Sequence, residues 1–178
     1  MTAAVIAASA SVLVAVLVFT LNQIGQFRQE RRQAKLSRIN SQLRDLYGPL
    51  NALVDVNERI WTAMRSEGLL PAQSERTPEG GTDVWRRWRD HALQPANRRM
   101  RDLIIEHADL LIGVEVPQVF RDFCAHVAAQ EIVIEGEDGH VKEAALIRHP
   151  GANFVAHVHE AFAALKKEQA ALLHVTTN

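Results

Sequence analysis

The chain has 178 residues, a formal net charge of -1, 47% hydrophobic residues and 23% charged residues. This composition fits one small globular domain with an added apolar segment. The single cysteine, Cys124, excludes an internal disulfide framework and fits a reducing compartment. Charge is unevenly distributed, since residues 1–101 carry 15 Lys/Arg and 9 Asp/Glu, whereas residues 102–178 carry 5 and 12. Such a separation is expected when one end of a protein lies near anionic lipid, and two solvated faces of uneven composition are the alternative.

The first 24 residues predict a transmembrane anchor. Ala3 to Leu21 contains no charge, Pro or Gly, and ten of its 19 residues are Val, Ile, Leu or Phe. As a helix it would be about 28 Å long, close to the thickness of a bilayer's hydrocarbon core. A buried core helix is the simpler alternative, but such helices seldom run this long without a polar position.

A cleavable signal peptide is the other alternative for this segment. It would place small residues after the apolar stretch, whereas here the small residues 7–11 come before it and no A-x-A-like site follows Phe19. We therefore expect the segment to be retained. Five basic residues follow it, opposed only by Glu30, and by the positive-inside rule they place the N-terminus outside and the following domain in the cytoplasm of an inner or plasma membrane. They are Arg28, Arg31, Arg32, Lys35 and Arg38.

Two patterns suggest self-association. Small residues recur every fourth position at Ala3, Ala7, Ser11 and Ala15, a spacing that lets two membrane helices approach closely or that arises by chance from alanine content. Residues 25–65 then predict a juxtamembrane helix with a heptad seam in which Asn57 occupies a core position. The seam comprises Leu36, Ile39, Leu43, Leu46, Leu50, Leu53, Asn57, Ile60 and Met64.

The same seam has a second interpretation, which we favour. It would equally serve a helix packed inside its own domain's bundle, and short seams are seldom stable as separate coiled coils. Pro49 interrupts it and predicts either a kink or the start of a new helix after a break near Tyr47. A homodimer remains the alternative.

A linker rich in Pro, Gly, Ser and Glu, residues 66–82, separates this helix from a helical domain over residues 83–178. Thr82 is the expected N-cap of a helix that passes Pro95 and is closed by Gly113. Pro117 opens a further helix, and the last one runs from near Pro150 to about His174. Residues 131–148 predict either the end of a helix or a small hairpin. The fold class expected is all-α, with the transmembrane helix, the long juxtamembrane helix and an antiparallel bundle.

Several short motifs resemble a family of small membrane-anchored bacterial helical proteins. They are Leu46-Tyr47-Gly48-Pro49-Leu50, Trp85-Arg86-Arg87-Trp88, Pro95-Ala96-Asn97-Arg98-Arg99-Met100, His107-Ala108-Asp109-Leu110-Leu111 and His126-Val127. The resemblance covers most of the chain beyond the anchor and implies a helical fold, but it implies no activity. The segment after Glu131 departs from the longer helix that the family would have there.

Residues that could carry chemistry are scattered. Asp122 and His126 share one helix face, as do His157 and Glu160, but the paired Glu-x-x-His motifs of a di-iron bundle are missing from the sequence. Cys124 lies on a face predicted to be buried, where packing explains it better than nucleophilic catalysis. Nucleotide-binding, zinc-protease and serine-hydrolase motifs are also missing. We therefore expect no cofactor, no metal and no catalytic residue, and an enzyme or metal-binding bundle built from these scattered groups is the alternative.

Clusters of arginine offer a further alternative, binding to anionic lipid or nucleic acid. Arg86, Arg87 and Arg89 alternate with tryptophans, and Arg98, Arg99 and Arg101 follow. Because the domain is tethered near a bilayer, lipid is the nearer partner and nucleic acid the less expected one. The leading hypothesis is a non-enzymatic, membrane-tethered cytoplasmic helical module that binds a protein partner or itself. The interaction residues expected are Arg28, Arg31, Arg32, Lys35, Asn57, Arg86, Arg87 and Arg89.

Overall fold

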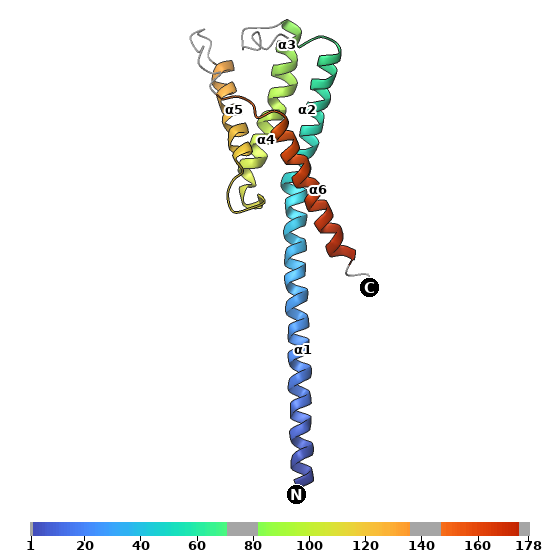
Figure 1. The fold of residues 1–178 in the computed structure, drawn as a ribbon. Coiled ribbons are helices and arrows are strands. Elements are labelled where there is room, and N and C mark those ends of the chain that lie inside the picture. The colour runs from blue at the N-terminus through green and yellow to red at the C-terminus, as the bar shows by residue number, and fades with distance from the viewer. Residues whose placement is uncertain (1, 71–81, 136–146, 175–178) are drawn as a thin grey trace.

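The chain folds into one long helix that carries a bundle of shorter helices at its C-terminal end (Figure 1). The computed structural model describes residues 2–70, 82–135 and 147–174, and the side chains of residues 16–70, 82–131 and 147–173. All regular secondary structure in these ranges is helical. The predicted all-α class is therefore confirmed for the described residues.

The elements form three helical segments, of which the first two are nearly continuous helices that each contain a π-helical turn (Figure 1). The first chain segment forms α1 (Thr2–Ser41), a π-helical turn η1 (Gln42–Tyr47) and α2 (Gly48–Ser66). The second forms α3 (Asp83–Trp88), a π-helical turn η3 (Arg89–Leu93), α4 (Gln94–Glu106) and a 3-10 turn η4 (Ala108–Leu110). The third forms α5 (Gln118–Glu135) and α6 (Ala152–His174). Helix α6 lies against α1, η1 and α2, while α4 lies between α2 and α5.

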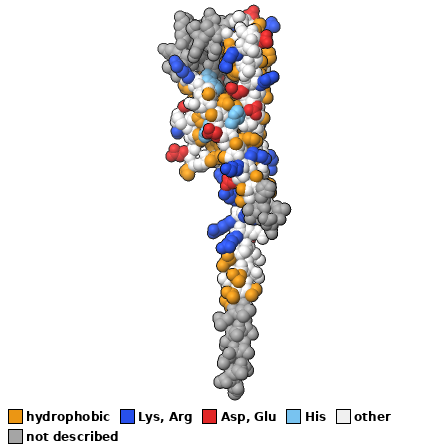
Figure 2. Space-filling model, turned by 45° about the vertical axis from the view of Figure 1, so that its right-hand side comes forward, with side chains coloured by type: hydrophobic (Ala, Val, Ile, Leu, Met, Phe, Trp, Pro, Cys, Tyr) orange, Lys and Arg blue, Asp and Glu red, His pale blue; other side chains and the backbone are white. Residues whose placement is uncertain are grey.

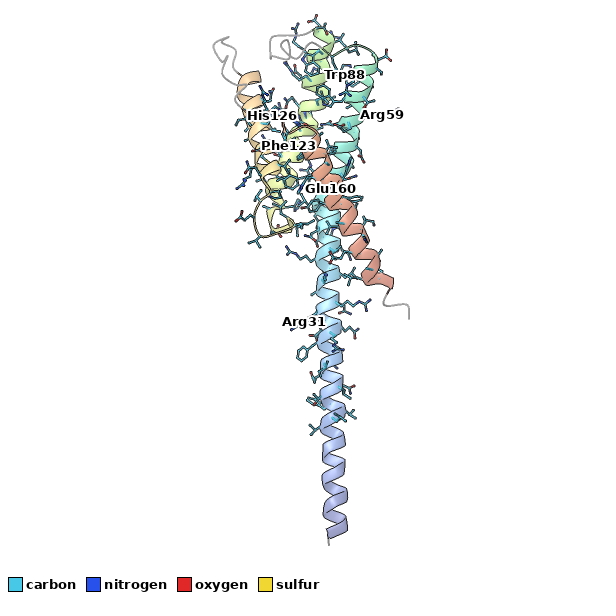
Figure 3. All side chains as sticks on the ribbon, viewed as in Figure 1. Arg31, Arg59, Trp88, Phe123, His126 and Glu160 are labelled. Carbon is cyan, nitrogen blue, oxygen red and sulfur yellow. The ribbon has the colours of Figure 1, made fainter. Side chains whose placement is uncertain are left out.

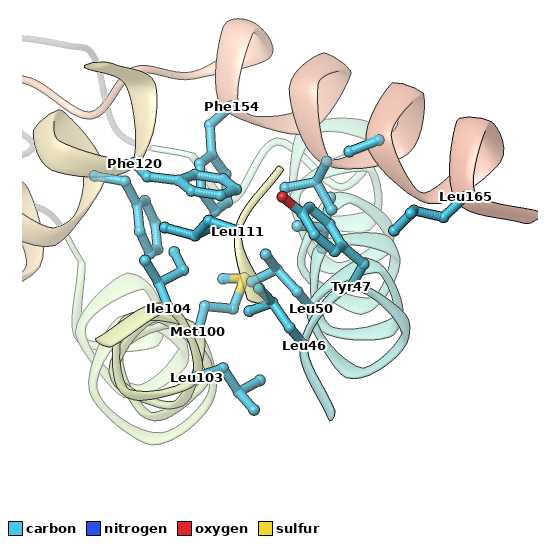
Figure 4. Close-up of a cluster of buried hydrophobic side chains, with 14 of the residues drawn as sticks. Leu46, Tyr47, Leu50, Met100, Leu103, Ile104, Leu111, Phe120, Phe154 and Leu165 are labelled. Atoms are coloured by element: carbon cyan, nitrogen blue, oxygen red, sulfur yellow. The ribbon is translucent and has the colours of Figure 1, made fainter. Parts of the chain in front are cut away.

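The core is centred on the junction between α1 and α2. Leu46, Tyr47 and Leu50 are fully buried there, and side chains from every later helix from α4 onward close around them (Figure 4). Phe120 and Phe123 of α5 and Phe154 of α6 supply the aromatic part. Phe123 and Phe154 stack with ring centroids 4.0 Å apart, a geometry that adds to the free energy gained by burying their area.

A π-helical turn lets the chain pass Pro49 without breaking. Proline has no N–H to donate, and its ring crowds the carbonyl four residues earlier. In η1 the Gly48 N–H donates instead to the Leu43 carbonyl, five residues back, which widens the backbone just before the proline. A Cβ on Gly48 would lie 2.3 Å from that carbonyl oxygen, so the turn requires glycine. The predicted break near Tyr47 is thus a change of helical pitch rather than an interruption.

The same arrangement occurs at the second proline. In η3 the Gln94 N–H donates to the Arg89 carbonyl, again five residues back, and Pro95 follows. Each π-helical turn inserts one residue and rotates the buried face. Leu93 is buried where the helical spacing from Trp85 would place Ala92, because η3 adds one residue between α3 and α4. Trp88, which precedes η3, is 42% exposed.

The heptad seam is buried within the chain's own bundle. Ile39, Leu46, Leu50, Asn57 and Met64 are all buried in the described structure. The remaining seam positions, Leu36, Leu43, Leu53 and Ile60, are half-buried. Val54, Tyr47 and Gln42 are buried as well, although the heptad pattern does not select them. The intramolecular interpretation of the seam accounts for these burials.

The predicted helix boundaries hold with one correction. Thr82 caps α3, since its Oγ1 accepts a hydrogen bond from the Trp85 N–H at 3.2 Å. Helix α6 begins at Ala152, close to the predicted start near Pro150, and is described as far as His174. However, α4 ends at Glu106 rather than at Gly113, because His107 leaves the helical region with φ -116° and ψ 33°. Residues 71–81 of the predicted linker and 136–146 of the helix-or-hairpin segment lie outside the described residues.

Among the residues described with side chains, no helix is both long enough and apolar enough to cross a membrane. The predicted anchor, residues 3–21, lies mostly outside that set, because side chains are described only from Val16 onward. The backbone of this segment is helical and belongs to α1.

Replacing Gly48 tests the π-helical turn. We expect Gly48→Ala to lower the free energy of unfolding by about 1–3 kcal/mol, because the new methyl group overlaps the Leu43 carbonyl oxygen, a backbone atom that cannot move aside alone. Denaturant unfolding of the full chain in detergent measures the change. Gly25→Ala is the matched control, since a Cβ there meets nothing within 4 Å and alanine favours helix. Equal stability of Gly48→Ala and the wild type would contradict the assignment.

Candidate functional site

The part of α1 that extends beyond the bundle exposes apolar side chains on every side. We call residues 2–31 the stalk, because the hydrogen bond from Arg32 to Leu172, near the C-terminal end of α6, marks where α6 joins α1 (Figure 1). Val16, Leu17, Val18 and Phe19 are consecutive, and each is between 51% and 64% exposed. Consecutive helical residues point in directions about 100° apart, so these four surround the helix. A helix that is apolar all round is normally buried in protein or in a membrane.

The polar side chain within this apolar region, Thr20, hydrogen-bonds to its own helix. The Thr20 hydroxyl donates to the Val16 carbonyl at 2.7 Å. A hydroxyl bonded to its own helix costs less to remove from water than a free one. Leu21, Ile24 and Phe27 continue the exposed apolar surface toward the bundle.

Five cations follow on one face of α1. Arg28, Arg31, Arg32, Lys35 and Arg38 fall within an arc of about 120° on an ideal helix, and we call them the basic stripe. Figure 2 shows Lys and Arg side chains gathered along α1 between its apolar end and the bundle.

The upper three cations of the basic stripe hold other elements. The Arg32 guanidinium donates to the Leu172 carbonyl at the C-terminal end of α6, where helix carbonyls lack intrahelical partners. Lys35 forms an ion pair with Glu168 of α6. Arg38 donates to the Asp109 carbonyl of η4 at 3.1 Å. These contacts fix α6 and the loop after α4 against α1.

The two cations nearest the apolar end differ. Arg28 and Arg31 are exposed and make no hydrogen bond or ion pair with any other described residue. Figure 3 shows Arg31 projecting from the stalk below the bundle. The structure therefore divides the basic stripe into three cations that bind the bundle and two that face outward.

A second exposed apolar surface lies on the loop after η4. Ile112, Val114 and Val116 are 43%, 104% and 39% exposed, and we call them the apolar loop. The loop is firmly held, since the Gln42 amide donates to the Leu110 carbonyl at 2.9 Å and the Ile112 N–H donates to the Tyr47 hydroxyl at 3.2 Å. The sequence analysis missed this surface, although the alternation of apolar residues around Gly113 and Glu115 was visible.

Asn57, the core position of the predicted seam, is buried within the bundle. Its side chain on α2 donates to the Asn97 Oδ1 of α4 at 2.9 Å, which links the two helices across the core. Its own Oδ1 and the Oε1 of nearby buried Gln94 have no partner among the described residues. Asn57 thus fixes how α2 and α4 pack, the role that a buried polar group has in helix pairing.

The arginine clusters of the second segment are largely paired with carboxylates. Arg86 pairs with Asp83 and Arg89 with Asp90, while Arg87 is exposed. Arg98 and Arg101 both contact Glu131 of α5. Such pairing reduces the positive charge available to a nucleic acid or a lipid surface at this end of the molecule.

Three residues of the enzyme hypothesis each contact a different neighbour in the described structure. The Asp122 carboxylate accepts from Gln118, His126 bonds the Ile147 carbonyl, and the His157 ring packs edge-on against Phe120. No group of three His, Cys, Asp or Glu side chains in the described structure is placed to hold a metal ion. Burial raises the pKa of the half-buried Cys124 thiol, which lowers its nucleophilic fraction at neutral pH.

Two histidines fasten the segment before α6 to α5. The rings of His126 and His149 meet edge to face at 5.1 Å, and His149 also contacts Phe123 and Phe154. Desolvation by these rings lowers the pKa of His149 to about 4, with a smaller contribution from His126. Burial likewise lowers the pKa of His126. His149 keeps an exposed side, so solvent screening reduces the energetic effect.

Comparison of the chain with protein-family models, curated proteins and solved structures gave no match. The motif resemblance noted in the sequence therefore does not assign a family, and function has to be argued from the surfaces described above.

The histidine pair predicts acid sensitivity. The unfolded chain takes up protons near the ordinary histidine pKa of 6.5, whereas folded His149 does so only near pH 4. The free energy of unfolding should therefore fall as the pH decreases from about 6.5 to 4, because the unfolded state binds more protons in that range. Unfolding of the full chain across this range measures the slope. His149→Phe should flatten it, and His91→Gln, at an exposed histidine, should leave it unchanged. A slope that persists in His149→Phe would assign the effect to other groups.

Proposed function

We propose that this protein is a membrane-tethered helical module that presents its bundle to a protein partner close to the bilayer. The observation that carries the proposal is the stalk. Its described apolar residues, from Val16 onward, surround the helix, are exposed, and adjoin the basic stripe. A single span ending in cations is the arrangement that positive-inside topology favours. The bundle would then face the cytoplasm.

The length of α1 supports the tether. Its 40 residues form one helix about 60 Å long, and the first 20 or so are enough to cross the hydrocarbon core. Apolar residues of the segment 3–21 favour insertion by roughly 0.3–0.6 kcal/mol each at mid-membrane. The remaining helix continues into the bundle without a break, so the bundle would be held at a fixed height rather than on a flexible linker.

The apolar loop supports an interaction role for the bundle. It presents Ile112, Val114 and Val116 at the end of the bundle nearest the stalk, on a loop that is hydrogen-bonded to η1 at Leu110 and Ile112 (Figure 1). A partner held at the same membrane would meet this surface. The heptad seam, in contrast, is already occupied within the chain. We therefore place the proposed interaction at the apolar loop and not at the seam.

Charging the stalk tests the tether. We expect Leu17→Lys/Phe19→Lys to shift the full chain from the membrane fraction to the soluble or aggregated fraction, because each lysine costs about 2.5–3.5 kcal/mol at the centre of a membrane helix. Cell fractionation and carbonate extraction measure the distribution. Val56→Lys is the control, since Val56 is 54% exposed on the bundle, close to the 60% of Leu17. An unchanged membrane fraction in the double variant would argue against the tether.

Photocrosslinking tests the partner surface. A benzophenone side chain at position 114 of the full chain should give discrete crosslinked species in intact cells, because Val114 is fully exposed on a well-held loop. The control places the same group at exposed Arg121 on α5, which should give none of these species. A product with twice the mass of the chain would indicate self-association, and a heterologous product a separate partner. Identical patterns from both positions would exclude the apolar loop as the contact.

A further inference from the structure

The cations of the basic stripe lie at increasing distances from the apolar end of α1. If the hydrocarbon core ends near Leu21 or Ile24, as the proposed tether requires, each later residue stands about 1.5 Å further from it. Arg28 then lies roughly 6–10 Å beyond the core, and Arg31 roughly 10–15 Å. The headgroup layer of one leaflet is about 5–8 Å thick, and an extended arginine side chain reaches back several ångströms toward it. Arg28 and Arg31 are thus the cations within reach of lipid phosphates.

The contacts of the basic stripe follow the same order. Arg28 and Arg31, nearest the apolar end, have no hydrogen bond or ion pair with any residue in the described ranges. Arg32, Lys35 and Arg38, further along, contact Leu172, Glu168 and Asp109 of the bundle. The cations that the bundle leaves unpaired are therefore those closest to the expected headgroup layer.

From this order we infer that Arg28 and Arg31 bind the phosphates of anionic lipid headgroups. The inference rests on the proposed tether. Both arginines lie within about 60° on one helix face, so they can contact the same lipid or two neighbours. A guanidinium group pairs with a phosphate through two parallel hydrogen bonds. A zwitterionic headgroup also carries a phosphate, but its own positive charge offsets the attraction. The protein should consequently select anionic over zwitterionic lipid, on one side of its helix.

Spin-label spectroscopy measures this selectivity directly. The full chain is reconstituted into phosphatidylcholine vesicles with a trace of lipid spin-labelled near the end of its acyl chain. One series carries labelled phosphatidylglycerol and the other labelled phosphatidylcholine. We expect the motionally restricted fraction to favour phosphatidylglycerol by about two- to fivefold, and the preference to decrease with salt because it is electrostatic.

Two double variants locate the effect. Arg28→Gln/Arg31→Gln should bring the preference close to one, since glutamine keeps the helix propensity and removes the charge. Arg59→Gln/Arg65→Gln is the matched control, because both arginines are exposed on α2. This helix lies in the bundle, on the far side from the stalk, as Figure 3 shows for Arg59. The control variant should keep the wild-type preference. The same preference in the wild type and in Arg28→Gln/Arg31→Gln would overturn the inference.

The experiment separates failure of the inference from failure of the tether. If labelled phosphatidylcholine shows no restricted component at all, the chain is not inserted and the proposed function fails with it. If that component is present but anionic lipid is not preferred, the tether stands and the inference is wrong. Salt-dependent binding of a DNA or RNA duplex that depends on Arg28 and Arg31, without lipid selectivity, would also overturn the inference in favour of a nucleic-acid surface.

Discussion

The junction at Tyr47, Gly48 and Pro49 is the constraint on which the rest of the structure depends. The same helical segment forms the exposed stalk and then, in η1 and α2, packs in the core. Pro49 lies at the transition between the two. The π-helical turn η1 accommodates this proline, because the Gly48 N–H bonds five residues back to Leu43. It also rotates Tyr47 fully into the core, where its hydroxyl accepts the Ile112 N–H. The turn thereby sets the helix direction, the centre of the core and the position of the apolar loop.

Polar contacts then arrange the later helices around this junction. Asn57 and Asn97 fix α2 against α4, Arg98 and Arg101 fix α4 against Glu131 of α5, and Arg32 and Lys35 fix α6 against α1. The exposed Lys35–Glu168 ion pair adds little to stability by itself, whereas the buried and half-buried contacts specify which helix faces meet. Consequently most of the cations predicted to be binding residues contact other groups of the same chain. Within the basic stripe, Arg28 and Arg31 are the cations without a partner among the described residues, and they lie at the end where the proposed membrane contact would be.

Sequence and structure agree where local physics is sufficient. Thr82 caps a helix because its hydroxyl accepts the Trp85 N–H, an interaction of two residues three apart. The heptad pattern selects Ile39, Leu46 and Leu50 as core because a helical face is defined by spacing alone. Simple helical spacing fails at Ala92, because the extra residue of the π-helical turn η3 shifts the phase and the proline that follows is its only signal in the sequence.

The amino-acid sequence by itself determined the all-helical class, the prolines at which the helices change, and the charge and hydropathy order along α1, since each depends on residues close together in the chain. Tertiary structure alone decided which partner covers the seam, because a stripe of leucines fits a second copy or the same bundle equally well. It also decided that Asn57 pairs with Asn97, and that Asp122, His126 and His157 each contact a different neighbour. Such pairings depend on how distant helices pack, and helix periodicity does not encode the rotation between them.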